Sequence, residues 1–72
     1  TTANPAGLTA RQLEVAQLVA DGLTNAEIAE HLVMSVRTVD SHVAAVLDKL
    51  EVATRRQVAR RAAELGLRPD RS

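Results

Sequence analysis

The chain carries four helix start signals in 72 residues, and this repetition limits its fold more than any other feature. Three are capping boxes, in which a threonine is followed three residues later by Glu or Gln: Thr9 with Gln12, Thr24 with Glu27, and Thr54 with Gln57. Ser35 supplies a fourth N-cap without the reciprocal partner. Gly22 and Gly66 stand where a left-handed helix C-terminus favours glycine. Together these signals predict helices over residues 10–21, 25–32, 36–50 and 55–65.

Apolar residues recur at intervals of three and four within each predicted helix, which places them on one face. The third helix has the clearest such face, formed by Val39, Val43, Val46 and Leu50. The other faces consist of Val15, Leu18, Val19 and Gly22, of Ile28, Ala29 and Leu32, and of Val58, Ala59, Ala62 and Leu65. No alternating strand pattern bounded by turn signals occurs. The predicted fold class is all-α, a compact four-helix domain over residues 8–67 between a linker (1–7) and a tail (68–72).

Three features that the sequence lacks exclude or disfavour whole classes of function. The sequence has no cysteine, which excludes a disulfide framework and a thiolate zinc site. It has no Phe, Tyr or Trp, and recognition of single strands and RNA loops usually depends on aromatic side chains that stack on bases. No apolar run approaches the roughly 20 residues that span a bilayer. We therefore expect a soluble cytoplasmic protein without a cofactor, membrane contact or small-molecule ligand. If it has a nucleic-acid partner, we expect duplex DNA and an association with the nucleoid.

The formal net charge is zero, but the charges are unevenly distributed. Residues 1–34 hold one basic residue and four acidic ones, whereas residues 35–72 hold eight basic and five acidic residues. A basic cluster stands out in the second half: Arg55, Arg56, Arg60 and Arg61. Such a cluster is typical of a solvated helix face and also of a surface that faces phosphates. Charge alone leaves both interpretations open.

Only residues 33–35, Val-Met-Ser, separate the second and third predicted helices. A short helix, a tight turn and a longer helix that begins with an N-cap form the helix-turn-helix arrangement. The turn lacks glycine, and short turns also join the helices of other small bundles. The spacing therefore indicates a helix-turn-helix without establishing it.

A set of residues spread along the predicted domain forms a recognisable motif: Leu8-Thr9-x-Arg11, Gly22-Leu23-Thr24-Asn25, Glu27-Ile28-Ala29, Leu32, Ser35, Thr38-Val39, His42, Lys49-Leu50, Val52 and Arg55. With these residues the chain resembles the LuxR-type DNA-binding domain, the four-helix output module of many bacterial transcription regulators. The resemblance implies a helix-turn-helix over residues 23–42 and sequence-specific binding of double-stranded DNA, with helix 36–50 in the major groove. It also implies a place as the C-terminal module of a longer regulator, a homodimer through the fourth helix and a contact with RNA polymerase.

The expected DNA-facing residues fall into two sets. The outer face of helix 36–50 carries Arg37, Asp40, Ser41, Ala44 and Asp48, opposite its apolar face. The resemblance implies that Asp40, Ser41 and Ala44 approach base edges, and we expect Arg37 to join them. It further implies phosphate contacts for Thr38, Lys49 and Arg55. We add Asn25, because the N-terminus of a helix can bind a phosphate through its N–H groups.

The fourth helix is ambiguous. Its small apolar side chains, Val58, Ala59 and Ala62, permit close approach of a second chain, and the resemblance implies that this helix forms the dimer contact. A packing helix with a solvated basic face is the alternative.

Two residues depart from the family pattern on the expected DNA side. Asp40 and Ala26 stand where many relatives carry lysine, in TVD and NAE instead of TVK and NKE. Each lost phosphate contact flattens the salt dependence of binding by about one unit of slope. Asp40 itself has three interpretations: a helix-stabilising carboxylate paired with Arg37, an acceptor for cytosine N4, or a sign of lost DNA binding. We expect an isolated domain to bind weakly or to depend on dimerisation.

Other function classes fit less well. His31 and His42 lie on different predicted helices with no cysteine available, so we expect no metal site. No nucleophile elbow or glycine-rich phosphate loop is present, so we expect no enzyme activity. The main alternative is a helical dimerisation or protein-interaction module with weak or no DNA binding. A promoter-binding segment of a sigma factor would be expected to have a more basic recognition helix.

Overall fold

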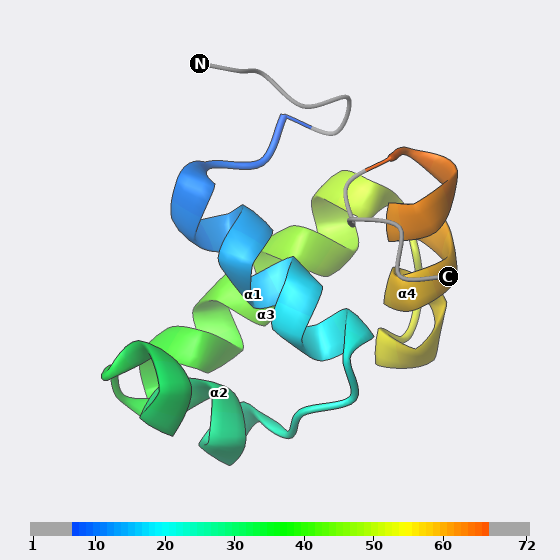
Figure 1. The fold of residues 1–72 in the computed structure, drawn as a ribbon. Helices are drawn as coiled ribbons and strands as arrows, with labels where there is room; N and C mark the ends of the chain where they lie inside the picture. The colour runs from blue at the N-terminus through cyan, green and yellow to red at the C-terminus, as the bar shows by residue number, and fades with distance from the viewer. Residues whose placement is uncertain (1–6, 67–72) are drawn as a thin grey trace.

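The computed structural model describes residues 7–66, which form four α-helices (Figure 1). They are α1 (Ala10–Ala20), α2 (Asn25–Leu32), α3 (Val36–Leu50) and α4 (Arg55–Glu64). No strand occurs among these residues. The all-α prediction is confirmed, and every predicted helix boundary lies within one residue of the observed one. The predicted linker and tail fall outside the described residues, apart from Gly7.

The first two helices begin with complete capping boxes. The Gln12 N–H donates to Thr9 Oγ1 at 3.1 Å, and the Thr9 N–H donates to Gln12 Oε1 at 3.1 Å. The corresponding distances between Thr24 and Glu27 are 3.1 and 2.8 Å. Each such cap stabilises its helix by about 0.5–2 kcal/mol, because free N–H groups at the helix start gain acceptors.

Each of the other two helix starts has one of these two kinds of bond. Ser35 Oγ accepts from the Thr38 N–H at 3.1 Å, so α3 begins at the predicted N-cap. At the start of α4, Gln57 Oε1 accepts from the N–H groups of both Ala53 and Thr54, at 2.8 and 3.1 Å. The side chain of Gln57 therefore holds the loop that enters α4.

Left-handed residues follow all four helices, but only two of these are glycine. Gly22 and Gly66 have φ values of +93° and +71°, as the sequence predicts. Val33 and Glu51, at the ends of α2 and α3, have φ values of +57° and +58°. A β-branched side chain rarely adopts this conformation. The sequence carries no signal for it at Val33.

The core lies where α1 packs against α3 and α4, while α2 packs against α3 and α1. In Figure 1, α1 crosses in front of α3, with α2 below and α4 to the right. The buried residues are Leu8, Val15, Ala16, Val19, Ile28, Ala29, Val39, Val43, Val46, Leu50, Val58 and Ala62. The predicted apolar faces are therefore confirmed, with Leu18, Leu32, Ala59 and Leu65 half-buried at their edges and Gly22 exposed. Nowhere in residues 7–66 does a helix have the length and apolar character needed to cross a membrane.

Candidate nucleic-acid interface

Helix α3 has one buried face and one exposed face. Val39, Val46 and Leu50 are fully buried against the other helices. The opposite side carries the side chains predicted to face outward, and all of them are exposed: Arg37, Asp40, Ser41, Ala44 and Asp48. Packing of the apolar face thus fixes which side of the predicted recognition helix is presented to a ligand.

Asp40 on this face is hydrogen-bonded to the start of α2. The Asn25 side-chain amide donates from Nδ2 to Asp40 Oδ1, with 2.5 Å between the two atoms. Asn25 is half-buried and is the first residue of α2. Both residues are expected at the DNA from the sequence, but their mutual contact is not predictable there, because 15 positions separate them in the chain.

Arg55 extends this contact to α4. One guanidinium nitrogen, Nη1, donates to Asn25 Oδ1, and the other, Nη2, donates to the Leu23 carbonyl oxygen at 2.7 Å. Helices α2 and α4 do not pack against each other directly. The half-buried side chain of Arg55 therefore bridges them. Leu23, whose carbonyl receives this bond, has no polar side chain that could have marked it in the sequence.

The predicted pairing of Asp40 with Arg37 is wrong, because no ion pair joins them. Asp40 turns toward α2, where Asn25 offers a donor held in place from its other end by Arg55. Arg37 makes no hydrogen bond or ion pair within residues 7–66. Its guanidinium is therefore free to meet a ligand at the start of α3.

Thr38 and Lys49 both take part in contacts within the domain. Thr38 Oγ1 lies 2.9 Å from Ser35 Oγ, and the Thr38 side chain is exposed. Lys49 Nζ donates to the Gly7 carbonyl oxygen at 3.1 Å and to Gln12 Oε1 at 2.9 Å. An ammonium group has three donors, so Lys49 keeps one for another acceptor while it ties the end of α3 to the start of α1.

The basic cluster on α4 is partly used inside the domain. Arg61 Nε donates to the Leu50 carbonyl oxygen at 3.1 Å, which satisfies a free C=O group at the end of α3. Arg60 and Arg61 both pair with Glu64, at 3.6 and 3.2 Å. Arg56 has no such partner among the described residues, so it shares with Arg37 the property of an uncompensated positive charge.

The dimer contact predicted for α4 needs correction. Val58 and Ala62 are 0% and 1% exposed, because they fill the core between α4 and its neighbours. They cannot contact a second chain while this fold persists. Ala59 is half-buried. The small residues of α4 serve close packing within the domain.

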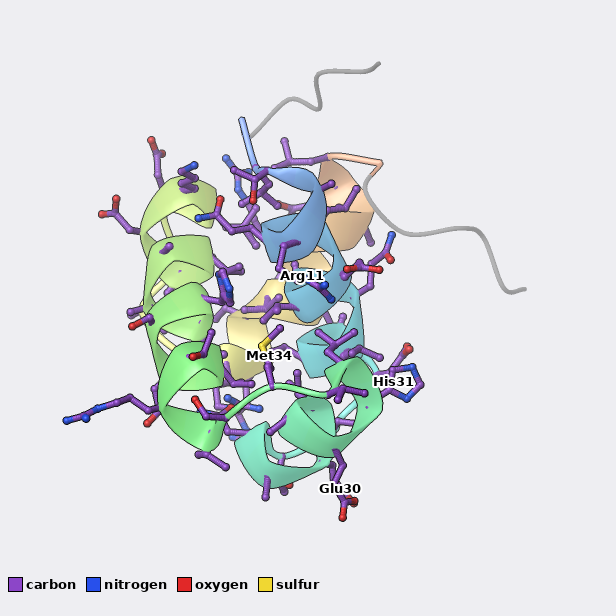
Figure 2. All side chains as sticks on the ribbon, turned by 90° about the vertical axis from the view of Figure 1, so that its left-hand side faces the viewer. Arg11, Glu30, His31 and Met34 are labelled. Atoms are coloured by element: carbon purple, nitrogen blue, oxygen red, sulfur yellow. The ribbon has the colours of Figure 1, made fainter. Side chains whose placement is uncertain are left out.

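The turn between α2 and α3 closes without glycine. The Met34 N–H donates to the Ala29 carbonyl oxygen at 2.9 Å, and its side chain points back into the bundle, where it packs against the core (Figure 2). Glu30 and His31 point away from the bundle at the end of α2 (Figure 2). No group of three or more His, Cys, Asp or Glu side chains that could hold a metal occurs in the described part of the chain.

Residues 6–62 match the family described as bacterial regulatory proteins, luxR family. The chain belongs to this luxR family. Among its relatives, the transcriptional regulatory protein LiaR of Bacillus subtilis (strain 168) is 46% identical over 52 residues, which are 72% of this chain and 25% of LiaR. The transcriptional regulatory protein DesR of the same strain is 44% identical over 64 residues, which are 89% of this chain and 31% of DesR.

A further relative is the uncharacterized response regulatory protein YgeK of Escherichia coli (strain K12), 40% identical over 60 residues, or 83% of this chain and 41% of YgeK. The chain therefore spans less than half the length of these curated relatives. Membership of the luxR family and the observed helix-turn-helix geometry support a role in DNA-binding transcription regulation. The family is one of regulatory domains and not of enzymes.

Proposed function

We propose that this domain binds duplex DNA sequence-specifically as the output module of a bacterial transcription regulator, with α3 inserted in the major groove. The division of α3 into a buried apolar face and an exposed face supports this proposal most directly. The 15 residues of α3 extend over about 22 Å, and the groove is roughly 12 Å wide. The short side chains of Ser41 and Ala44 let the helix backbone approach the base edges.

The base-facing set in this proposal begins with Arg37, whose free guanidinium suits guanine O6 and N7. Ser41 can donate to or accept from a base edge, and the Ala44 methyl group can contact a thymine methyl. These three residues are exposed in the first three turns of α3, and in a helix-turn-helix complex the N-terminal part of the recognition helix contacts the bases.

The phosphate-facing set combines residues that keep donors after their internal bonds are made. The sequence predicts Thr38, Asn25, Lys49 and Arg55. The last three each keep an N–H that their contacts within the domain leave available, and the exposed Thr38 hydroxyl lies beside Ser35 Oγ. Arg56 joins them as a new candidate, because it follows Arg55 at the start of α4 and has no partner in residues 7–66.

The test begins with duplexes enriched from a random pool by this domain, titrated at two salt concentrations with scrambled competitor. Arg37→Ala should lower the preference for one base pair by about tenfold, since a bidentate arginine contributes about 1–3 kcal/mol of discrimination. Arg56→Ala should weaken binding to all sequences and reduce the salt slope by about 0.9. Arg60→Ala is the matched control, because this exposed arginine already pairs with Glu64 on α4.

The result that counts against this function is binding without any sequence preference at low salt. That outcome favours a helical protein-interaction module, to which the zero net charge and the absence of lysine at Ala26 and Asp40 also point. Contact with RNA polymerase stays a prediction.

A homodimer through α4 would place two recognition helices on two half-sites. Because Val58 and Ala62 are buried, such a contact has to use the outward face, on which Ala63 is exposed. Sedimentation velocity tests this with Ala63→Glu. A dimer in the parent that becomes a monomer in the variant supports the contact, whereas identical behaviour of the two proteins rejects it.

A further inference from the structure

We infer that Asp40 is a positioning residue, which holds the entrance of α2 and the start of α4 against the recognition helix and does not read a base. This inference rests on the proposed function. Its basis is the continuous chain of hydrogen bonds from the Leu23 carbonyl through Arg55 and Asn25 to Asp40. This series of hydrogen bonds begins before α2, passes through α4 and ends on the exposed face of α3.

The charges at the two ends determine how the Asn25 amide is turned. Its oxygen faces the guanidinium of Arg55, and its NH₂ group faces the carboxylate of Asp40. The reversed amide would set donor against donor at Arg55 and acceptor against acceptor at Asp40. Asp40 and Arg55 therefore fix the amide orientation jointly, and hydrogen bonds to charged groups are among the stronger ones in proteins.

These hydrogen bonds directly connect α2 and α4, two helices that do not pack together. Helices α2 and α4 lack direct helix–helix packing, so the hydrogen bonds of Arg55 link the start of α4 to the entrance of α2, while α1 and α3 support α4 by packing. Asp40 supplies the third attachment, on α3. Loss of its acceptor would free the Asn25 amide and, through it, one contact of the Arg55 guanidinium, so two proposed phosphate contacts would lose their orientation together.

The same geometry argues against base recognition by Asp40. Its Oδ1 atom is already bonded to Asn25, and the side chain turns toward α2. The amide of Asn25 lies between this carboxylate and the guanidinium of Arg55. The carboxylate that stands among the DNA-facing residues is in this way part of the scaffold, and base recognition falls to Arg37, Ser41 and Ala44.

Two substitutions at Asp40 separate the hydrogen bond from the charge. Both Asp40→Asn and Asp40→Ala remove the negative charge, but only the asparagine keeps an acceptor for Asn25. We expect the alanine variant to bind the enriched duplex about two- to tenfold more weakly than the asparagine variant, the factor typical of one lost hydrogen bond. The factor should be the same for every base-pair variant of the duplex, and it should fall to one when Asn25 is also replaced by alanine.

The matched control is Asp48, which lies on the same exposed face of α3. Asp48→Asn and Asp48→Ala should bind alike. Two outcomes overturn the inference. The first is a changed preference at a single base pair in Asp40→Ala, which would make Asp40 a base reader. The second is a difference between the two Asp40 variants that persists without Asn25.

A measurement without DNA separates this inference from the proposed function. The sequence has only two asparagines, so the side-chain NH₂ signals of Asn25 can be assigned by NMR. The hydrogen-bonded proton of Asn25 should shift in Asp40→Ala and stay in place in Asp48→Ala. An unshifted signal rejects the hydrogen-bonded chain even if DNA binds. Conversely, a shifted signal in a protein that binds no DNA supports the hydrogen bonds between Asp40 and Asn25. It rejects the proposed function, and with it the role of Asp40 in positioning residues for DNA.

Discussion

Val33 gives the sharpest test of the backbone of the helix-turn-helix. This valine has a φ of +57° at the end of α2 and is 88% exposed, so its side chain gains almost nothing from packing. An L-residue in the left-handed region costs about 1–2 kcal/mol, and a β-branched one belongs to the least tolerant. We predict that Val33→Gly stabilises the domain.

The expected magnitude is a difference of two effects. Glycine adopts the left-handed conformation without strain in the folded protein. It also makes the unfolded chain more flexible, which lowers the free energy of unfolding by about 0.5–1 kcal/mol. The net gain in the free energy of unfolding should be about 0.5–1 kcal/mol, or a Tm increase of about 2–8 °C for a domain of this size. Urea and thermal unfolding followed by far-UV circular dichroism measure it, since the chain has no aromatic residue for fluorescence.

The control is the same substitution three residues later. Val36 is also exposed, at 46%, but it lies in the first turn of α3 with helical geometry. Val36→Gly should lower the free energy of unfolding by about 1 kcal/mol, through poorer helix propensity and lost partial burial. Opposite signs at the two positions support the conformational argument. A loss of stability in both variants refutes it.

Three further predictions concern the core and one turn. Gly22→Ala should lower the free energy of unfolding by about 0.5–1 kcal/mol in urea, the left-handed cost less the gain from a stiffer unfolded chain. Because a Cβ there meets nothing within 4 Å, an unchanged stability would contradict this conformational cost. Leu50→Ala should lower the free energy of unfolding by about 2–5 kcal/mol in the same measurement, because Leu50 is fully buried. Leu47→Ala, at a half-buried position, should cost less. The reverse order would contradict the observed packing. Val58→Glu should unfold the domain, since it places an unpaired charge in the core. Ala63→Glu on the exposed side of α4 should change stability by less than about 0.5 kcal/mol, and a folded Val58→Glu protein would show that this core assignment is wrong.

The sequence by itself determined the four helices and their apolar faces. The reason is that the signals are local: a cap joins residues three apart, as Thr24 and Glu27 are, and a helix face repeats every three or four residues. The proposal that α3 is the recognition helix follows from the same local pattern together with the family resemblance. The exposed positions of Arg37, Ser41 and Ala44 needed only the phase of the buried face of α3.

Only the tertiary structure decided which polar groups meet across helices. Asn25 and Asp40 are 15 positions apart, and Arg55 lies 32 positions from its acceptor at Leu23. No local rule links such residues, because their distance depends on how α2, α3 and α4 pack. The same holds for Val58. It belongs to a face of small apolar side chains on α4, which by sequence suits either a second chain or the core. Packing of α4 against α1 and α3 assigns it to the core, and the bond from Asn25 gives Asp40 a partner that its spacing from Arg37 did not indicate.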